Sequence, residues 1–573
     1  MNRIPLNRSL AVLLLVPLFA FAGPGDPPKN YDEVHRADGS YRLHYEGIGQ
    51  VYEKIPAKRK KELLVEGEKL FEGDNPLNLL PRVLTEDEMA TLEAGVKQRA
   101  TALKLFFQDH YSGKKSYLKE NVLPRDFVDQ IIARHGEQSW EGKIPDSALS
   151  WLYGPDILRL PDGSFAVVED NFGYLGGLGD LERAPDALLK LVPEYQRYLE
   201  VPNPLAFYQK LANRYHARAE KFGGKAVLLT YRPSEFDDNE GFRLRDLMDR
   251  FGVESVYFNS LASPDGRTAK YLEVRENGVY LKTKVGGKTK SEKVGYLFIQ
   301  GHMDDMDSLS EGARRGRLIK VAEGYLEHMG EKADARVVKM MHENALGNPF
   351  TIGEAETLLK EAVGAAGYKE PYLTVGKGGV PGLFDAIHSG KVGANYTPGL
   401  GFVEDKEFYT AVPDLIRFYL HEEPKLGNLS TESFRKFADG KAVFDQTVFD
   451  RVFADFDQYV VKGVAGMGGK EVWIGKKMAK AEIEELKAKV RESPSLFIVQ
   501  EYKPLSVMDG NLVDLRLIAD VGPKLGDVAT APFPWGRASP LSGSGKVNIS
   551  SGGSETAVFV RKNASMDCET LFH

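Results

Sequence analysis

The sequence is almost free of cysteine: Cys568 is the only one among 573 residues. A single thiol cannot form a disulfide within the chain, and this one has no neighbours with which to build a cysteine metal site. Any bound metal is therefore expected among oxygen ligands. Oxygen ligands favour magnesium, or alternatively manganese, over structural zinc.

An excess of positive charge is also missing. The chain has 75 Lys and Arg against 82 Asp and Glu, a net charge of −7. Such a chain offers no basic field to attract nucleic acid, so no nucleic-acid partner is expected. With 42% hydrophobic and 27% charged residues it has the composition of a globular protein. Its length predicts several domains or lobes.

Long apolar runs are confined to the start of the chain. Arg3 and Arg8 precede the apolar run 10–20. Ala20-Phe21-Ala22 fits a cleavage site before Gly23. Residues 1–22 therefore resemble a secretory signal peptide, although a short anchor or a buried first helix is the alternative. We expect export to the periplasm or the medium, without stable membrane insertion after signal removal. A cytoplasmic location is expected if the signal does not function.

The rest of the chain alternates helical and strand patterns. Residues 23–60 are polar and are expected to be irregular, whereas residues 84–137 have helical periodicity that begins with a capping box at Thr85 and Glu88. Residues 225–260 read as strand, helix and strand, which predicts a βαβ unit with parallel strands. Further strands are predicted at 294–299, 458–462, 471–474, 496–500 and 515–521, with helices at 352–366 and 480–492.

Three oxygen-bearing side chains surround a predicted hairpin. Strands at 157–160 and 164–168 flank the turn sequence Pro161-Asp162-Gly163. Glu169 and Asn171 lie two residues apart and share one face of an extended chain, and the turn could bring Asp156 beside them. Such a set suits a six-coordinate magnesium ion. A solvated hairpin with surface acids is the alternative.

A lysine and a run of glycines follow another predicted strand. Lys462 ends the strand, and Gly463, Gly466, Gly468 and Gly469 lead into the next one. Glycine lets backbone N–H groups approach phosphate oxygens closely, and the lysine supplies positive charge. This is not a Walker A motif, because no helix opens with Gly-Lys-Ser/Thr. A structural hairpin with a flexible turn remains the other interpretation.

Two further polar groups lie on later strands. Gln500 and Glu501 end a strand and could contact the edge of an adenine, or they are simply exposed. Asp514 and Arg516 share a strand face, and Arg537 follows. Arginines so placed could hold a transferring phosphoryl group, although a surface ion pair is equally consistent with the pattern.

The order of these segments resembles the circularly permuted ATP-grasp type 2 family over most of residues 84–562. The matching segments are EAGVKQRATALKLFFQDHY, YGPDILRLPDGSFAVVEDN, FDAIHSGKVGANYTPGLGFVEDKEFY, YVVKGVAGMGGKEVWIG, LFIVQEYKPLS, VDLRLIADV and VNISSGGSETAVFV. In ordinary ATP-grasp enzymes the metal-binding strands follow the nucleotide lysine. Here the hairpin comes far before Lys462, as a permutation predicts.

The resemblance implies an α/β fold with α+β lobes, namely a circularly permuted ATP-grasp with a Rossmann-like pre-ATP-grasp βαβ domain. The N-terminal helical region and the permuted metal-binding strands are expected at 23–215, and the Rossmann-like domain at 216–345. A connecting substrate-side region is expected at 346–450, and the nucleotide-binding lobe at 451–573.

The resemblance also implies residue roles. The magnesium ligands would be Asp156, Glu169 and Asn171. The nucleotide contacts would be Lys462, Gly466, Gly468, Gly469, Gln500, Glu501 and Asp514, with the glycines forming a mobile flap over the phosphates. The catalytic arginines would be Arg516 and Arg537, beside the transferred phosphoryl group. Asn395, Asp405 and Lys406 match further family positions, to which no role is assigned.

The activity implied by the resemblance is amide formation driven by ATP and Mg²⁺. A carboxylate would be phosphorylated to an acyl phosphate, and an amine would then displace phosphate. The partners would be small-molecule or peptide carboxylates and amines. Because spaces outside the cytoplasm hold little ATP, an exported, non-catalytic nucleotide- or ligand-binding protein is the alternative. A structural envelope protein that uses the same fold is a third class.

The chain departs from the family at two places. After Glu-Asp-Asn the family usually continues with an arginine and then Pro-Ser-Gly, whereas this chain has Phe172-Gly173-Tyr174-Leu175-Gly176-Gly177. An Arg-Arg pair of the family is replaced by Gln300-Gly301-His302. Both changes fall on presumed substrate positions, so the substrate class is where this chain is expected to differ.

Overall fold

The computed structural model describes residues 30–70, 76–135, 144–199, 203–231, 239–257, 268–301, 306–307, 311–366, 379–397, 399–438, 441–464, 471–549 and 552–561. The residues outside the described ranges include the predicted signal segment, His302, Gly466, Gly468, Gly469 and Cys568. Among the described helices, none combines the length and the apolar character needed to cross a bilayer.

A seven-stranded sheet combines two strands from the first third of the sequence with strands from its last third. Its order is β11-β4-β3-β19-β22-β23, and β18 pairs with β19. Its strands are β3 (Asp156–Arg159), β4 (Phe165–Glu169), β11 (Gly427–Asn428), β18 (Ser506–Met508), β19 (Asn511–Arg516), β22 (Trp535–Pro540) and β23 (Ser554–Thr556). The predicted hairpin is confirmed, because β3 and β4 pair antiparallel around the turn. β3 also pairs with β19, which places Asp156 opposite Arg516.

A second sheet, with six strands, has the order β6-β5-β9-β8-β7, and β10 pairs with β9. Its strands are β5 (Lys225–Thr230), β6 (Glu254–Tyr257), β7 (Thr268–Arg275), β8 (Gly278–Val285), β9 (Lys288–Gln300) and β10 (Gly393–Ala394). The predicted βαβ unit is confirmed, because β5 and β6 are parallel and α8 (Asn239–Arg250) connects them. The Rossmann-like character of the region stays a prediction, since β7 and β8 extend the sheet antiparallel.

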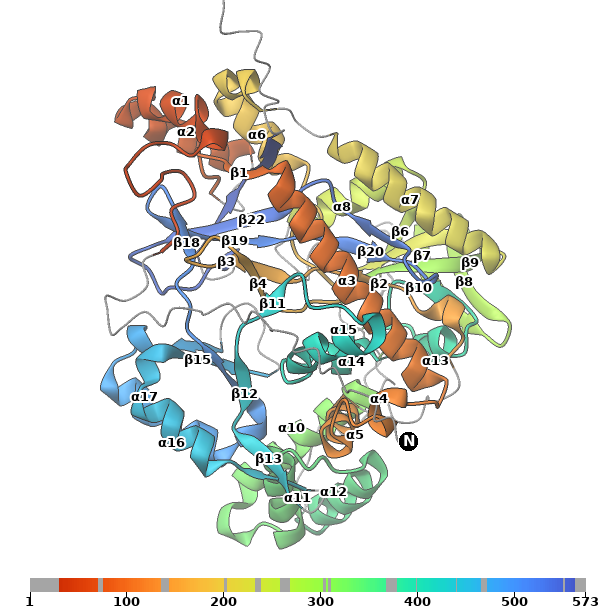
Figure 1. Ribbon diagram of the computed structural model, residues 1–573. Coiled ribbons are helices and arrows are strands. Elements are labelled where there is room, and N and C mark those ends of the chain that lie inside the picture. Colours follow the sequence, from red (N-terminus) through yellow and green to blue (C-terminus); the bar gives the residue numbers. More distant parts are fainter. Residues whose placement is uncertain are drawn as a thin grey trace, which may run out of the picture.

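A third sheet belongs to the part of the chain predicted to bind nucleotide. Its antiparallel order is β12-β17-β15-β16, from β12 (Thr431–Ser433), β15 (Tyr459–Gly463), β16 (Val472–Ile474) and β17 (Phe497–Glu501). Together with α16 (Gln446–Ala454) and α17 (Lys480–Glu492) it buries a hydrophobic core of its own, which includes Phe449, Val461 and Leu486. This nucleotide lobe lies at the lower left of Figure 1.

Helix α3 (Glu86–Tyr111) lies across the front of the molecule in Figure 1. Its predicted capping box is confirmed, since Glu88 N donates to Thr85 Oγ1 and Thr85 N donates to the Glu88 carboxylate. Three acidic residues occupy its first turn, where they interact favourably with the helix dipole. The helix is long enough to carry buried side chains to both the seven-stranded sheet and the region around residue 400.

The expectation that residues 23–60 are irregular is wrong for part of that segment. α1 (Ile48–Lys54) and the first residues of α2 (Ala57–Leu70) lie within it. Both helices are polar on their outer faces, and they bury Ile48 and Leu63 in a core shared with α6 (Arg183–Leu191). The few apolar residues of this segment did not predict helices, because they are buried only by contact with α6.

The single strand predicted at 515–521 is also wrong. β19 ends at Arg516, and β20 (Ala519–Val521) starts a separate three-stranded sheet with β2 (Trp151–Tyr153) and β21 (Val528–Thr530). Leu517 and Ile518, at the crossing, are fully buried in the main core. Because the residues on both sides of the crossing are buried and apolar, the hydrophobic pattern of the sequence does not show where one strand ends and the next begins.

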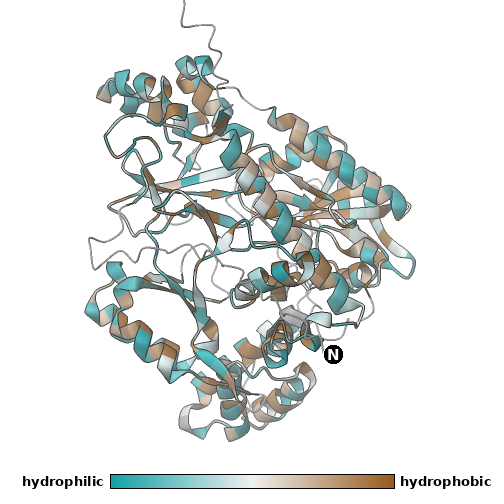
Figure 2. Cartoon of the chain, in the orientation of Figure 1, coloured by the Kyte–Doolittle hydropathy of each residue, from teal (hydrophilic) through white to brown (hydrophobic). Residues whose placement is uncertain are grey.

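The remaining helices and strands complete the packing around these four sheets. They are β1 (Arg82–Thr85), α4 (Ser116–Lys119), α5 (Arg125–His135), α7 (Pro204–Lys221), α10 (Glu311–Met329), α11 (Ala335–Leu346), α12 (Ile352–Ala366), α13 (Leu383–His388), α14 (Leu400–Val403), α15 (Val412–Leu420), β13 (Arg435–Ala438), β14 (Lys441–Phe444) and β24 (Val558–Arg561). α12 and α17 have their predicted bounds. Strands mix brown and teal residues, and surface helices such as α7 show teal faces in Figure 2, as burial of one helix face requires.

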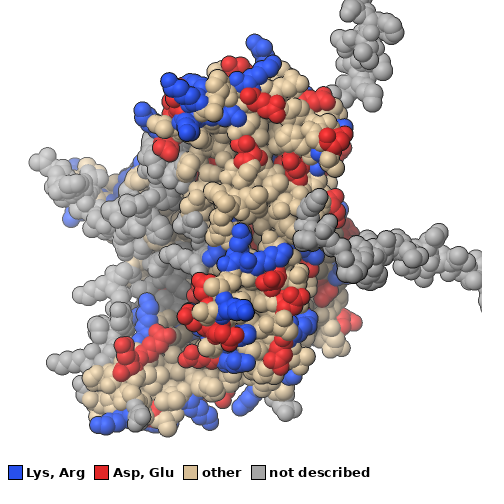
Figure 3. Space-filling view, turned by 90° about the vertical axis from the view of Figure 1, so that its left-hand side faces the viewer, with Lys and Arg blue, Asp and Glu red and all other residues tan. Residues whose placement is uncertain are grey.

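Charges of both signs lie side by side on the face shown in Figure 3. Lys and Arg are interspersed there with Asp and Glu, in keeping with the small net charge of −7. Long-range attraction of a highly charged partner is not favoured by such a mixed surface.

Candidate functional site

A hollow lies where the seven-stranded sheet meets the nucleotide lobe. It is lined by Val168, Glu169, Asp170, Glu404, Lys406, Tyr409, Lys462 and Ile498. These residues come from β4, from the segment after α14, and from β15 and β17. The hairpin that carries the predicted metal ligands and the strand that ends near Lys462 therefore face each other, although they are far apart in the sequence.

The lining of the hollow combines apolar and charged side chains. Val168, Tyr409 and Ile498 form the apolar part. The Tyr409 hydroxyl donates to Val167 O (2.6 Å) and accepts from Leu429 N (2.9 Å), which fixes the ring. The lining thus offers both apolar and charged groups to a ligand.

Two lysines line the hollow. Lys462 is 8% exposed, and burial lowers its pKa, while the Glu169 carboxylate acts in the opposite direction. Lys406 Nζ lies 3.1 Å from Glu169 Oε1 and donates to Val464 O at 3.5 Å. Val464 lies at the start of the glycine-rich segment, between Gly463 and Gly466. Two ammonium groups thus share the hollow with the Glu169 and Asp170 carboxylates at the end of the hairpin and with Glu404. The ammonium groups could bind the phosphates of a nucleotide.

Glu404 also opens into this hollow. Its Oε1 accepts a hydrogen bond from Phe172 N at 3.4 Å, at the end of the hairpin. The carboxylate is accessible from the hollow but is surrounded by its walls, and this desolvation raises the pKa of Glu404 to about 7. No pattern in the sequence singled out Glu404.

Asp156 is held by two arginines. Arg516 donates to both carboxylate oxygens (2.7 and 3.1 Å), and Arg537 Nη2 lies 3.0 Å from Oδ2. Burial opposes ionisation, but the two guanidinium groups outweigh it and hold the pKa of Asp156 well below its ordinary value. Asp156 is directly opposite Glu169 in the β3–β4 ladder, so the two carboxylates lie on the same face.

The three predicted metal ligands fit a hard cation by their chemistry. Asn171 Nδ2 donates to Gly154 O (3.1 Å), which leaves its side-chain oxygen as the atom available to an ion. Two carboxylates and one amide oxygen are donors that Mg²⁺ prefers. Among the described residues no three His, Cys, Asp or Glu side chains are grouped for a metal. Magnesium binding by Asp156, Glu169 and Asn171 stays a prediction.

Asp514 orients Arg537 through a bidentate ion pair. Arg537 donates to both of its oxygens (2.9 and 2.7 Å), and the two residues are paired across β19 and β22. Burial raises the pKa of Asp514 against the influence of Arg537. Asp514 is not among the residues that line the hollow. Its observed contacts orient Arg537, and its predicted contact with the nucleotide stays a prediction.

Gln500 and Glu501 are engaged within the protein. Gln500 Nε2 donates to Val168 O (3.3 Å) and to Thr431 Oγ1 (3.0 Å), so it ties β17 to both β4 and β12. Glu501 accepts from Ser430 N (3.1 Å) and pairs with Lys503 (2.9 Å). Ile498 on the same strand lines the hollow instead. The role of this pair beside an adenine stays a prediction.

The hairpin is anchored from α3 by a buried ion pair. Arg99 is 0% exposed, and it donates to both Asp170 oxygens (2.6 and 3.3 Å). Tyr153 OH donates to Asp170 Oδ1 at 2.5 Å. Asp170 lies between Glu169 and Asn171, so this pair sets the backbone that presents both. The Gln-Arg dipeptide of α3 matched the family, but its function was not predicted.

The family positions that had no assigned role serve two different purposes. Asn395 Oδ1 accepts from Ile299 N (2.6 Å) and its Nδ2 donates to Ile299 O (3.1 Å), which extends the pairing of β10 with β9. Lys406 lies in the hollow. Asp405 points away from it, toward Arg134 (2.9 Å) and His135 (2.9 Å).

The segment that departs from the family closes around Arg516 and Trp535. Arg516 Nη1 donates to Gly176 O at 3.2 Å. Gly177 has φ +94° and its Cα approaches the Trp535 ring so closely that a Cβ would lie 2.2 Å from it. Trp535 also lies under both guanidinium groups, 5.7 Å from Arg516 and 5.3 Å from Arg537. The missing arginine is thus replaced by a glycine loop that contacts a catalytic candidate.

Comparison with known proteins gives matches over most of the chain. The family model described as circularly permuted ATP-grasp type 2 matches residues 81–239 and 374–519, more than half of the chain. An uncharacterized protein of Mycobacterium tuberculosis (strain H37Rv) is 25% identical over 559 residues, which cover 92% of this chain and 84% of that protein.

Two further similarities concern proteins with informative names. A Frankia casuarinae protein named "Putative glutamate--cysteine ligase 2-2" is 26% identical over 565 residues, which cover 92% of this chain and 53% of that protein. The solved apo form of a glutathione synthetase-like effector (GSS30) of Globodera pallida has a TM-score of 0.47 and 9% identity. That match covers 87% of this chain and 96% of the effector.

Proposed function

The chain belongs to the circularly permuted ATP-grasp type 2 family, and from this premise we propose that it is an ATP-dependent ligase that joins a carboxylate to an amine. The observation that carries the proposal is the hollow in which Lys462 and Lys406 meet Glu169 of the hairpin. A relative named as a glutamate–cysteine ligase supports an amide-forming reaction of this kind. The acid and the amine of this chain are not implied by that name.

ATP and Mg²⁺ would be held in the hollow. Lys462 and Lys406 would contact the phosphates, and the base would lie against the apolar residues. Asp156, Glu169 and Asn171 would hold the divalent ion, which supplies charge neutralisation for the phosphates when bound. The predicted flap, Gly466, Gly468 and Gly469, would cover them and exclude water.

The two arginines would act on the transferred group. In the proposed reaction a carboxylate oxygen attacks the γ-phosphorus and ADP leaves, forming an acyl phosphate. The amine nitrogen then attacks the acyl carbon, phosphate leaves, and the nitrogen loses one proton to give the amide. Arg516 and Arg537, oriented by Asp156 and Asp514, would stabilise negative charge on the phosphoryl oxygens in both steps.

The first test is a calorimetric titration of the protein with Mg-ATP. Saturable binding is expected, with a rise in unfolding temperature, because a ligand at 100 times its Kd stabilises the folded state by about 2.7 kcal/mol. ADP release is then followed with a panel of amino acids and short peptides as acids and amines. An absence of both binding and thermal shift would reject the proposal.

Lys462→Ala is expected to weaken Mg-ATP binding by about 10- to 100-fold, because one charge-assisted contact contributes about 1.5–3 kcal/mol. The measurement is the Kd from calorimetry. Lys480→Ala is the matched control, since Lys480 is an exposed lysine on the same lobe. Equal affinities of the Lys462 variant and the wild type would contradict the role of Lys462.

Glu169→Gln is expected to lower turnover by about 100-fold, a typical loss when one group that stabilises the transition state is removed. Nucleotide affinity should be kept or strengthened, because the substitution releases Lys406 from its carboxylate partner. Parallel measurements of ADP release and Kd separate the two effects. Asp162→Asn, at the exposed turn of the same hairpin, is the control. A large loss of affinity with full turnover would be inconsistent with this assignment.

Export stays a proposal, and it bears on a second candidate function. If residues 1–22 are removed during secretion, the mass of the secreted protein should correspond to a chain that begins at Gly23. The glycine loop that replaces the family's arginine favours a non-catalytic nucleotide-binding protein as the alternative. That alternative predicts Mg-ATP binding without ADP release for any acid and amine.

A further inference from the structure

The four residues 404–407 direct alternate side chains to opposite sides of one chain segment. Glu404 and Lys406 line the hollow. Asp405 and Glu407 point the other way and are 3% exposed, in a buried group of charged residues. The segment joins α14 to the 3₁₀ turn 408–411, so little regular structure of its own holds it in place.

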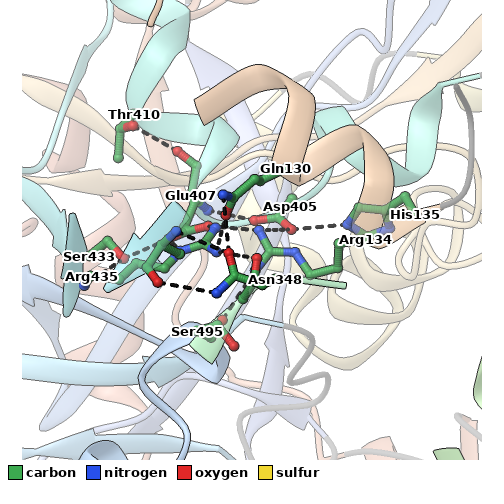
Figure 4. Close-up of polar contacts among 12 residues, drawn as sticks. Gln130, Arg134, His135, Asn348, Asp405, Glu407, Thr410, Ser433, Arg435 and Ser495 are labelled. Carbon is green, nitrogen blue, oxygen red and sulfur yellow. Dashed lines mark hydrogen bonds and ion pairs between the residues drawn. The ribbon is translucent and has the colours of Figure 1, made fainter. Parts of the chain in front are cut away.

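Glu407 is the centre of the buried group (Figure 4). Its Oε1 accepts from Arg435 Nε (2.8 Å) and Ser433 Oγ (2.6 Å). Its Oε2 accepts from Arg134 Nη2 (2.7 Å) and also from Arg435 Nη2. Arg435 therefore forms a bidentate pair, the geometry in which arginine is strongest and most directional.

Asp405 continues the network toward α5. Its Oδ2 lies 2.9 Å from both Arg134 Nη2 and His135 Nε2, and its Oδ1 accepts from Glu407 N at 2.9 Å. The last contact closes a tight turn of the backbone around Lys406. The backbone on both sides of Lys406 is thus fixed by carboxylates that cannot move without breaking buried ion pairs.

The same arginines connect separate parts of the fold. Arg435 starts β13 next to the nucleotide lobe and also donates to Gly347 O (3.3 Å), just after α11. Arg134 comes from α5 and donates to Ser495 O (3.1 Å), just before β17. The network therefore lies where the nucleotide lobe joins the rest of the molecule, one residue away from the lysine in the hollow.

On the premise of the proposed function, we infer that Arg435 and Arg134 are positioning residues that set Lys406 against the nucleotide phosphates. A backbone that is already fixed beneath Lys406 does not have to be ordered when the phosphates bind, so the lysine is presented preorganised. Lys406 Nζ contacts both Glu169 and Val464 O, so a displaced backbone would remove it from the hairpin and from the start of the glycine-rich segment at once. Because desolvation offsets much of the attraction in a buried ion pair, we infer a role in geometry for this network rather than one in stability alone.

The decisive experiment is a double-mutant cycle on Mg-ATP affinity. Arg435→Lys keeps the charge but cannot form the bidentate pair with Glu407. We expect Arg435→Lys and Lys406→Ala each to weaken binding by about tenfold, and the double variant to be little weaker than either single one. Non-additivity means that Arg435 acts through Lys406. Multiplied losses, or an unchanged affinity in Arg435→Lys, would overturn the inference.

Hydrogen exchange of the free protein gives a readout that needs no nucleotide. Peptides covering residues 400–411 should exchange several-fold faster in Arg435→Lys, because local opening follows the loss of buried contacts. If the wild type binds no Mg-ATP, the proposed function fails. The hydrogen-exchange rates of residues 400–411 then test by themselves whether Arg435 holds this segment in place. Unchanged exchange then overturns the inference as well.

Two variants guard against simple misfolding. Ser433→Ala removes the 2.6 Å hydrogen bond to Glu407 and the 3.3 Å hydrogen bond that Ser433 Oγ accepts from Arg435 N, but keeps the Arg435 guanidinium, and should reproduce the effects of Arg435→Lys in weaker form. Arg451→Lys is the matched control, because Arg451 pairs with Glu432 at 2.7 Å on the exposed surface of the same lobe. If Arg451→Lys weakens Mg-ATP binding as much as Arg435→Lys does, the effect of Arg435 is one of general stability, and its specific role in positioning Lys406 is refuted.

Discussion

Replacement of Arg516 by methionine is expected to lower turnover by about three orders of magnitude, the scale on which an arginine stabilises phosphoryl transfer. Arg516 holds Asp156 opposite Glu169 and reaches the loop that replaces the family's arginine. Methionine keeps much of the length and apolar contact of the side chain with Trp535 but removes the charge. The measurement is ADP release with an acid and amine pair that supports wild-type activity.

The affinity for Mg-ATP should change by no more than a few-fold in this variant, because Lys462 and Lys406 are untouched. Arg417→Met, an exposed arginine on α15, serves as the control for a general loss of positive charge. Arg516→Lys should recover only part of the activity, since an ammonium group cannot contact both oxygens of Asp156 as the guanidinium does. Wild-type turnover in Arg516→Met would remove Arg516 from the catalytic group.

The largest expected effect on stability is at Arg99. Replacing Arg99 with methionine leaves Asp170 buried without its cationic partner, and breaking such a pair costs about 3–5 kcal/mol. The free energy of unfolding should fall by about that amount. Urea denaturation followed by tryptophan fluorescence measures it, because Trp151 is fully buried in the core that α3 shares with the hairpin.

Lys97→Met on the same helix is the matched control. Lys97 forms an exposed pair with Glu93, and such pairs contribute about 0–1 kcal/mol. A double change of Arg99 to methionine and Asp170 to leucine should recover much of the stability, because no isolated charge then remains buried. The double variant should still bind divalent ions poorly, since Asp170 fixes its neighbours Glu169 and Asn171. Full stability of Arg99→Met would contradict this account of the anchor.

Elements with a strong local signal could be predicted closely. α3 begins at its capping box, the β3–β4 hairpin surrounds Pro161-Asp162-Gly163, and the β5-α8-β6 unit has the expected order. In each case a few neighbouring residues contain the whole signal, because caps, turns and side-chain periodicity act over short distances. α1 and α2 were missed because their few apolar residues are buried only against α6.

The residues of the candidate site can also be divided into those with a local sequence signal and those without one. Asp156, Glu169, Asn171 and Lys462 could be selected because each lies at the end of a recognisable strand, and the structure brings Glu169 and Lys462 to one hollow. Tyr409 and Glu404 gave no signal, since an aromatic or an acid in a helical region is usually structural. The adenine-side role of Gln500 stays a prediction, and its amide joins β17 to β4 and β12.

The sequence by itself determined the secondary elements with local signals, the family, and which polar side chains share a strand face. Only the tertiary structure decided their partners: two arginines on Asp156, Lys406 on Glu169, and Arg435 and Arg134 on Glu407. The physical reason is that side-chain direction along a strand follows from the backbone period of two, which any short stretch contains. Contacts between distant segments depend on how separately packed cores meet, and no short stretch of sequence contains that information.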